Sequence, residues 1–313
     1  MTFTLTWHDD VSRQARVLAY AFRFTLKPTL SVWPLTDGGI RVIAKLDRAV
    51  DMLPKPKRVS IEQVTLGGVP CEMTTHPRVA TGSLEGATVL YFHGGGFVFC
   101  GLATHRSACA TMAARAGIPV YSVEYRQIPN GGIGTSIADA MASYRAALET
   151  VADPKKIIVA GDSAGGYLAM KVAEIAVLEG LTPPAAVLGF SPLLSLDLKR
   201  HPRHFMQKDA YLPMKQVLAL EDRWLNGPDA IPGAASPIEA DPSVFPPVFL
   251  STAEYELMRP DVEAMTRRLA AAGSSVETHV WKGQVHAFPV MEGALPEGRT
   301  VLDLALAFAA RNL

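Results

Sequence analysis

The sequence has few cysteines, no excess charge of either sign and no long hydrophobic run. Cys71, Cys100 and Cys109 are the three cysteines among 313 residues. They are too few and odd in number for a disulfide framework, so we expect a reducing, cytoplasmic location. Their spacing does not fit a zinc site. For Cys100 we expect the role of a buried small hydrophobic residue.

Charge is balanced over the whole chain. Thirty basic and thirty acidic side chains give a formal net charge of zero, and no Lys/Arg-rich run occurs. Nucleic acids and anionic membrane surfaces are therefore poor candidates for the main partner. The first ten residues contain neither a basic region nor a cleavage site, so we expect no signal peptide. The apolar stretch Val17–Leu26 is short and carries Arg23, which favours an amphipathic helix over a membrane span.

The composition, 49% hydrophobic and 19% charged, fits one large domain with an insertion. From residue 56 onward, predicted strands alternate with predicted helices. The expected strands are 59–66 and 70–75, joined by a Gly67-Gly68 hairpin turn, then 88–92, 118–124, a strand from Ile157, 186–190, 247–252 and 276–281. The expected helices include 104–117 with Thr104 as cap, 136–151, 215–225, 261–272 and 299–311. This order predicts an α/β fold with a mostly parallel central sheet flanked by helices.

Two segments interrupt the alternation. Residues 1–55 indicate helices before any strand signal, and residues 196–226 carry little strand signal. We expect both to form a helical cap over a catalytic domain spanning 56–313. Apolar side chains that fit such a cap are Trp33, Phe205, Met206, Tyr211 and Leu212.

The apolar run from Ile157 ends in Gly161-Asp162-Ser163-Ala164-Gly165 and continues as an amphipathic segment. A Gly-x-Ser-x-Gly turn between strand and helix is typical of a nucleophile elbow, in which side chains larger than glycine at 161 and 165 would collide with neighbours. The helix that follows directs its N-terminal amides toward developing negative charge. The alternative, a packing turn or a phosphate cradle, is weakened because the lysine of a P-loop is absent.

A second motif, His93-Gly94-Gly95-Gly96, ends the predicted strand 88–92. Consecutive glycines can expose amide groups to a developing oxyanion, and one such donor contributes about 3–4 kcal/mol to lowering a barrier. By itself the motif also fits a flexible glycine turn. Its place upstream of the elbow favours an oxyanion-binding loop.

A serine nucleophile requires a base and an orienting carboxylate, which in sheet enzymes of this type follow it in the order acid, then histidine. His286 follows the last predicted strand and is our candidate base, whereas His279 within that strand is expected to be a sheet-face residue. Three carboxylates, Glu254, Glu256 and Asp261, follow the strand 247–252. Asp261 fits a helix cap, but the residues alone do not decide among the three.

The motifs HGGG and GDSAGG, a late acid and His286-Ala287-Phe288 together resemble the bacterial hormone-sensitive lipase family of α/β-hydrolase esterases, over nearly the whole chain. In that family the acid lies in a segment similar to Ala-Glu-Tyr-Asp-Pro-Leu-Arg. The match of Ala253-Glu254-Tyr255 and Arg259 to this segment implies that Glu256 is the catalytic acid. Departures at Tyr167, at Ala287 and at 127–132 bear on the shape of the pocket.

The resemblance implies an oxyanion hole made by the amides of Gly95, Gly96 and Ala164. His93 and Gly94 then serve as a scaffold for this loop, as Gly161 and Gly165 do for the elbow. By analogy a homodimer, paired through the last strand and helix, is also expected.

The sequence thus predicts a serine carboxylesterase for small ester substrates with short-to-medium acyl chains. Ser163 attacks, His286 acts as base and Glu256 stabilises the imidazolium, without metal or organic cofactor. Acyl transfer or amide cleavage by the same residues is one alternative. A ligand receptor on this fold is another, disfavoured because His286 is retained.

Overall fold

A nine-stranded sheet forms the centre of the computed structural model, which describes residues 4–199, 208–227, 229 and 236–313. The strand order is β1-β9-β8-β7-β6-β4-β5-β3-β2. The pairs β2–β3 and β3–β5 are antiparallel, and the other pairs are parallel. The strands are β1 (Thr4–His8), β2 (Ser60–Leu66), β3 (Val69–Thr75), β4 (Thr88–Phe92), β5 (Val120–Val123), β6 (Ile157–Asp162), β7 (Ala186–Phe190), β8 (Val248–Ala253) and β9 (Val276–Trp281).

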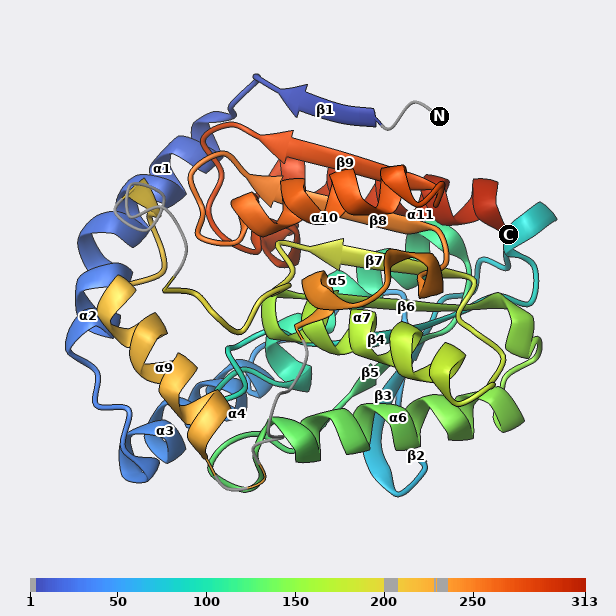
Figure 1. The fold of residues 1–313 in the computed structure, drawn as a ribbon, viewed down its shortest axis with the longest axis horizontal. Coiled ribbons are helices and arrows are strands. Elements are labelled where there is room, and N and C mark those ends of the chain that lie inside the picture. Colours follow the sequence, from blue (N-terminus) through green and yellow to red (C-terminus); the bar gives the residue numbers. More distant parts are fainter. Residues whose placement is uncertain (1–3, 200–207, 228, 230–235) are drawn as a thin grey trace.

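Helices cover both faces of the sheet (Figure 1). One face carries α5 (Leu102–Ala116) and α11 (Pro296–Asn312), and the other carries α6 (Ile133–Thr150), α7 (Ser163–Leu178) and α10 (Arg259–Ala271). Alternate residues of the central strands therefore enter two separate cores. In β4, Val89 and Tyr91 pack toward α5 and α11, while Leu90 and Phe92 pack toward α6 and α7. The mostly parallel sheet predicted from the apolar runs is confirmed.

The first strand is a correction to the sequence-based prediction, which placed no strand before residue 59. Thr4–His8 pairs in parallel with β9, from Thr4 opposite Glu277 to His8 opposite Trp281. His8 also stacks on Trp281, with ring centroids 3.7 Å apart. The first residues of the chain thus belong to the sheet. They also occupy the outer edge of β9, the strand through which a homodimer was expected to pair.

Several helices begin earlier than predicted. Helix α5 starts at Leu102 with Gly101 as its N-cap, so Thr104 lies in the first turn, where its hydroxyl accepts from the Gly101 amide at 3.0 Å. The Asp47 carboxylate accepts hydrogen bonds from the amides of Ala103 (3.3 Å) and Thr104 (2.8 Å). Helices α10 and α11 start at Arg259 and Pro296 with proline in the first turn. Proline lacks the N–H that a first turn leaves unpaired, so it is compatible with a helix start.

The remaining helices gather at the carboxyl ends of the parallel strands (Figure 1). They are α1 (Arg13–Ala21), the π-helical segment η1 (Phe22–Leu26), α2 (Lys27–Val32), α3 (Asp37–Ile43), α4 (Lys45–Asp51) and, from the insertion, α9 (Met214–Asn226). Gln216 of α9 donates to the Trp33 carbonyl at 2.9 Å, and Arg223 pairs with Asp37 at 2.6 Å. The N-terminal helices and the insertion therefore contact each other.

Part of the predicted insertion, including Phe205 and Met206, lies outside the described residues. Among the residues that are described, no helix is both long enough and apolar enough to cross a membrane.

Candidate active site

The turn between β6 and α7 places Ser163 in a left-handed backbone conformation, with φ of 50°. Its neighbours must be small. A Cβ atom on Gly165 would lie 1.9 Å from the Phe92 carbonyl oxygen, and one on Gly161 would lie 2.4 Å from the Gly165 backbone. Both distances are far below a van der Waals contact. Glycine is therefore required at 161 and 165 because the backbone of β4 packs directly against the turn.

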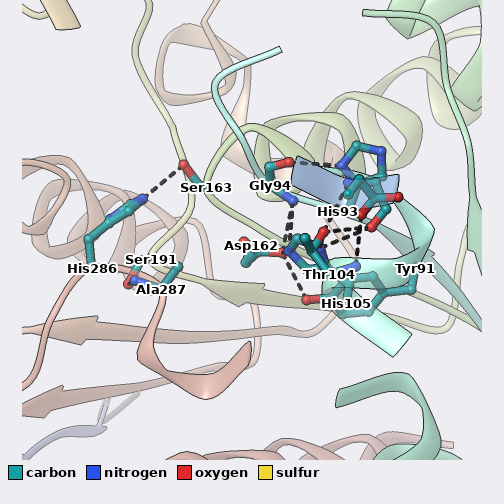
Figure 2. Close-up of polar contacts among 12 residues, drawn as sticks. Tyr91, His93, Gly94, Thr104, His105, Asp162, Ser163, Ser191, His286 and Ala287 are labelled. Carbon is teal, nitrogen blue, oxygen red and sulfur yellow. Dashed lines mark hydrogen bonds and ion pairs between the residues drawn. The ribbon is translucent and has the colours of Figure 1, made fainter. Parts of the chain in front are cut away.

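Ser163, His286 and Glu256 form one chain of hydrogen bonds. The Nδ1 atom of His286 donates to Glu256 Oε2 at 2.9 Å, and its Nε2 atom lies 2.9 Å from Ser163 Oγ (Figure 2 shows this second contact). Because the carboxylate can only accept, Nε2 is left free to accept the serine proton. Glu256 and His286 are 0% and 3% exposed. The three residues come from three separate connections, all at the carboxyl ends of strands.

The structure also separates the three candidate acids. Glu256 Oε1 accepts from the Ala253 amide at 3.1 Å and from the Thr252 hydroxyl, which fixes the carboxylate toward His286. Glu254 is half-buried, and its carbonyl accepts from Arg259 at 2.8 Å. Asp261 lies in the first turn of α10. Of the three, Glu256 is the one bonded to His286.

The surroundings of His286 raise its pKa above the ordinary value of a histidine. Burial by itself disfavours the imidazolium, but the hydrogen bond and charge of Glu256, followed by the charges of Asp209 and Asp162, outweigh this effect. A base whose cation is stabilised in this way is suited to take up a proton from a serine hydroxyl. His279, as expected, sits on the sheet, where it contacts His8 at 2.9 Å.

The HGGG loop is held to the elbow by Asp162, the residue just before the serine. Its Oδ1 atom accepts from the Gly94 amide at 3.0 Å and from the Tyr91 hydroxyl at 2.9 Å, and lies 3.1 Å from His105 Nε2 (Figure 2). A Cβ atom on Gly94 would lie 2.1 Å from the other carboxylate oxygen. The first glycine of the motif is thus required by this close approach.

The pKa values of Asp162, His105 and His93 depend on one another. Burial opposes ionisation of Asp162, yet the charge and hydrogen bond of His105 lower its pKa, and Asp162 in turn raises the pKa of His105 against the effect of burial. Burial and the charge of His105 lower the pKa of His93 to about 4. His93 is therefore neutral near pH 7. It stacks on Tyr125, whose hydroxyl donates to the His93 carbonyl at 2.7 Å.

The second and third glycines line the cavity and have positive φ angles of 115° and 61°. The Gly95 carbonyl accepts from the Val98 amide at 3.1 Å, and the Gly96 carbonyl accepts from the Trp224 indole at 3.0 Å. Trp224 belongs to α9 and is 3% exposed. The insertion is thus hydrogen-bonded directly to the HGGG loop.

A second contact joins the insertion to the loop that carries Glu256. The buried carboxylate of Asp209 accepts from the amides of Tyr211 (2.7 Å), Leu212 (2.8 Å) and Leu257 (3.2 Å). Leu257 directly follows Glu256. Burial raises the pKa of Asp209, while the charge of His286 acts in the opposite direction.

The cavity above Ser163 has a volume of about 320 Å³. Its walls combine the HGGG loop and the elbow with apolar side chains from the N-terminal helices, the insertion and the segment after His286. The apolar lining residues include Phe22, Phe99, Leu193, Tyr211, Leu212, Val217, Leu220, Trp224, Met258, Val290 and Met291. Tyr211 and Leu212 thus line the cavity as predicted, whereas Trp33 instead donates to the Gly39 carbonyl at 3.0 Å. Cys100 also lines it and is partly exposed, which corrects the expectation of full burial.

Sequence reasoning missed Asp162, His105, Asp209 and Trp224. Asp162 was visible inside the GDSAGG motif, where a buried acid next to Ser163 needs a partner. The other three reach the site from distant positions, and no local pattern marks them.

The family described by the α/β hydrolase fold matches residues 89–290 of this chain. The esterase LipU of Mycobacterium tuberculosis is 32% identical over 273 residues, which cover 85% of this chain and 88% of that protein. The carboxylesterase NlhH of the same organism is 30% identical over 310 residues, covering 92% and 95%. The crystal structure of an esterase from the bacterial hormone-sensitive lipase family superposes with a TM-score of 0.82 at 26% identity, over 97% of this chain and 99% of that chain. The chain therefore belongs to the α/β hydrolase fold family, and within it to the bacterial hormone-sensitive lipase family.

Proposed function

We propose that this protein is a serine carboxylesterase that hydrolyses small esters with short-to-medium acyl chains. The observation that carries the proposal is the hydrogen-bonded chain from Ser163 through His286 to Glu256 at the floor of an apolar cavity. The names of the esterase relatives support the same reaction.

In the proposed reaction His286 removes the hydroxyl proton as Ser163 attacks the ester carbonyl. The amides of Gly95, Gly96 and Ala164 donate to the oxyanion of the tetrahedral intermediate. The intermediate collapses to an acyl-enzyme when His286 protonates the leaving alcohol. Water, deprotonated by His286, then attacks the acyl-enzyme, the bond from the acyl carbon to Ser163 Oγ breaks, and His286 returns the proton to Oγ as the acid is released. Glu256 stabilises the imidazolium in both halves of the reaction.

The cavity supports an uncharged substrate. Its lining is mostly apolar, and the ionisable groups that reach it, such as Asp162, His105 and His286, are bonded to one another or to Ser163. A charged acyl or alcohol group would lose its hydration without gaining an opposite charge. We propose that residues 1–55 and 196–226, apart from β1, act as the cap that shapes this cavity.

Hydrolysis of a p-nitrophenyl ester series from acetate to laurate tests the proposal. We expect turnover of short and medium esters by the wild type and its loss in Ser163→Ala, with Ser195→Ala as a control at a buried serine whose hydroxyl bonds the insertion backbone. Inertness of the wild type toward every ester, or equal activity of Ser163→Ala, would contradict it. Added alcohol or amine distinguishes hydrolysis from acyl transfer by the products formed.

Two further expectations belong to this proposal. A cytoplasmic location is supported by Cys71, Cys100 and Cys109, which are all free thiols.

A homodimer stays a prediction by analogy. Because β1 covers the outer edge of β9, such a dimer must use β1 or another surface, and light scattering of the purified protein measures whether it forms.

A further inference from the structure

Helix α1, η1 and α2 form one uninterrupted helical segment whose outward face is apolar. Val17, Tyr20 and Phe24 are 69%, 68% and 60% exposed. Their spacing of three and four residues places them on one face, and the Tyr20 and Phe24 rings lie 4.5 Å apart. We call these three residues the outer stripe. Of the fifteen large hydrophobic side chains exposed in the described residues, eight lie between residues 11 and 58, so exposed apolar surface is concentrated in this part of the chain.

The same face carries positive charge. Arg13 and Arg16 are exposed and precede the outer stripe at helical spacing, and no acidic residue occurs from 11 to 36. Residues 11–58 hold ten basic and three acidic side chains, a net charge of +7 in a chain whose total is zero. The net charge of zero, which argued against a partner with an anionic surface, does not show that positive charge is concentrated in residues 11–58.

The opposite face of the segment forms part of the active-site wall. Phe22 lines the cavity and packs on Tyr211, with ring centroids 5.3 Å apart. Arg23 and Lys27 tie the segment to the insertion through the carbonyls of Lys208 (2.7 Å) and Asp209 (2.5 Å). The helical segment that carries the outer stripe therefore forms part of the cavity wall through Phe22, and it lies at the carboxyl-end side of the sheet (Figure 1).

We propose that the outer stripe docks the protein on a lipid bilayer surface that carries anionic headgroups. A helix face of aromatic and aliphatic side chains beside arginines, free of acids, has the composition of helices that lie in the membrane interface. Anionic headgroups complement the +7 segment. A symmetric contact with a second copy would instead set this positive surface against itself.

Sedimentation with vesicles tests the proposal without using turnover, so its outcome is independent of the proposed esterase activity. We expect binding to vesicles of phosphatidylcholine mixed with phosphatidylglycerol, weaker binding to phosphatidylcholine alone, and a decrease with added salt. Each basic residue near an anionic bilayer contributes about a fivefold factor to binding, so Arg13→Glu with Arg16→Glu should lower it by at least about 25-fold. Tyr20→Ser with Phe24→Ser should weaken binding to both vesicle types, because it removes apolar area.

Matched variants keep the test specific. Lys155→Glu with Arg267→Glu makes the same change in charge at exposed positions elsewhere, and Val177→Ser with Leu178→Ser removes exposed apolar side chains from α7. Both controls should bind vesicles as the wild type does, and circular dichroism verifies that every variant is folded. The proposal is wrong if the wild type does not bind the anionic vesicles at low salt, or if the controls lose as much binding as the stripe variants. A concentration-dependent dimer abolished by Tyr20→Ser with Phe24→Ser, without vesicle binding, would identify a second copy as the occupant and overturn it.

Discussion

Replacing Glu256 by glutamine should prevent His286 from acting as a base without changing the shape of the site. In the wild type Oε1 accepts from the Ala253 amide and the Thr252 hydroxyl, and Oε2 accepts from His286 Nδ1. The glutamine oxygen takes the Oε1 position, because the Ala253 amide can only donate. Its NH₂ group then faces the N–H of Nδ1, so two donors meet.

The imidazole relieves this clash by moving its proton to Nε2, the atom that lies 2.9 Å from Ser163 Oγ. A protonated Nε2 cannot accept the serine proton. We therefore expect kcat for a short ester to fall by about 10⁴-fold, the loss that follows when a triad acid is replaced by its amide. In free energy this corresponds to about 5.5 kcal/mol of transition-state stabilisation.

The pH dependence gives a second readout. The reaction needs neutral His286, so kcat/KM falls as pH drops through the pKa of this group. Because Glu256 raises that pKa above 6.5, the acid limb of the wild-type profile should lie above pH 6.5. In Glu256→Gln burial still lowers the pKa while the largest opposing contribution is gone, so the acid limb should move to lower pH.

Steady-state kinetics on p-nitrophenyl butyrate from pH 5 to 9 measures both effects. Glu256→Asp keeps the charge but is one methylene shorter, and should retain more activity than Glu256→Gln. Glu254→Gln changes a half-buried acid in the same loop and should leave kcat unchanged. A kcat of Glu256→Gln within tenfold of the wild-type value, or an acid limb that does not move, would contradict the role assigned to Glu256.

Two other substitutions test the loops around the nucleophile. Trp224→Phe keeps the apolar wall but removes the donor to the Gly96 carbonyl. In steady-state kinetics kcat should therefore fall about tenfold with little change in KM. A higher KM at unchanged kcat would mean that Trp224 only lines the cavity. Gly165→Ala places a Cβ atom 1.9 Å from the Phe92 carbonyl oxygen, and thermal unfolding should show a loss of about 3 kcal/mol or more. Gly38→Ala, whose Cβ atom would meet only the Thr36 hydroxyl oxygen at 4.0 Å, is the matched control and should not be destabilised.

Much of the sheet could be predicted because its central strands are buried on both faces. The runs 88–92 and 186–190 coincide with β4 and β7, since continuous burial leaves a continuous apolar sequence. Strand β1 could not be predicted in this way. It is a short edge strand, and its partner β9 lies at the far end of the chain, so the pairing that makes it a strand has no local signature.

The site too was predictable only where it has a local signature. The elbow and the HGGG loop require glycine because their backbones lie very close to neighbouring atoms, so the glycine motifs predict both. The residues alone did not decide the proposed acid, because Glu254, Glu256 and Asp261 lie close together after the same strand. The structure distinguishes them: the Thr252 hydroxyl and the Ala253 amide hold the Glu256 carboxylate toward His286, an arrangement created by the turn after β8.

The insertion does more than cover the cavity. Through Asp209 it bonds the amide that follows Glu256, and through Trp224 it bonds the carbonyl of Gly96. Each of these bonds contributes about 1 kcal/mol if neutral and about 1.5–3 kcal/mol where the carboxylate accepts. Breaking both bonds therefore costs a few kcal/mol, and a full displacement would also expose Val217 and Trp224, which are 6% and 3% exposed. Smaller movements of a cap are the kind that admit substrate and release product. Because both bonds end on loops that carry the proposed machinery, a displaced insertion would loosen the acid and the oxyanion loop together. The enzyme should then reach full activity only with the cap closed over a substrate.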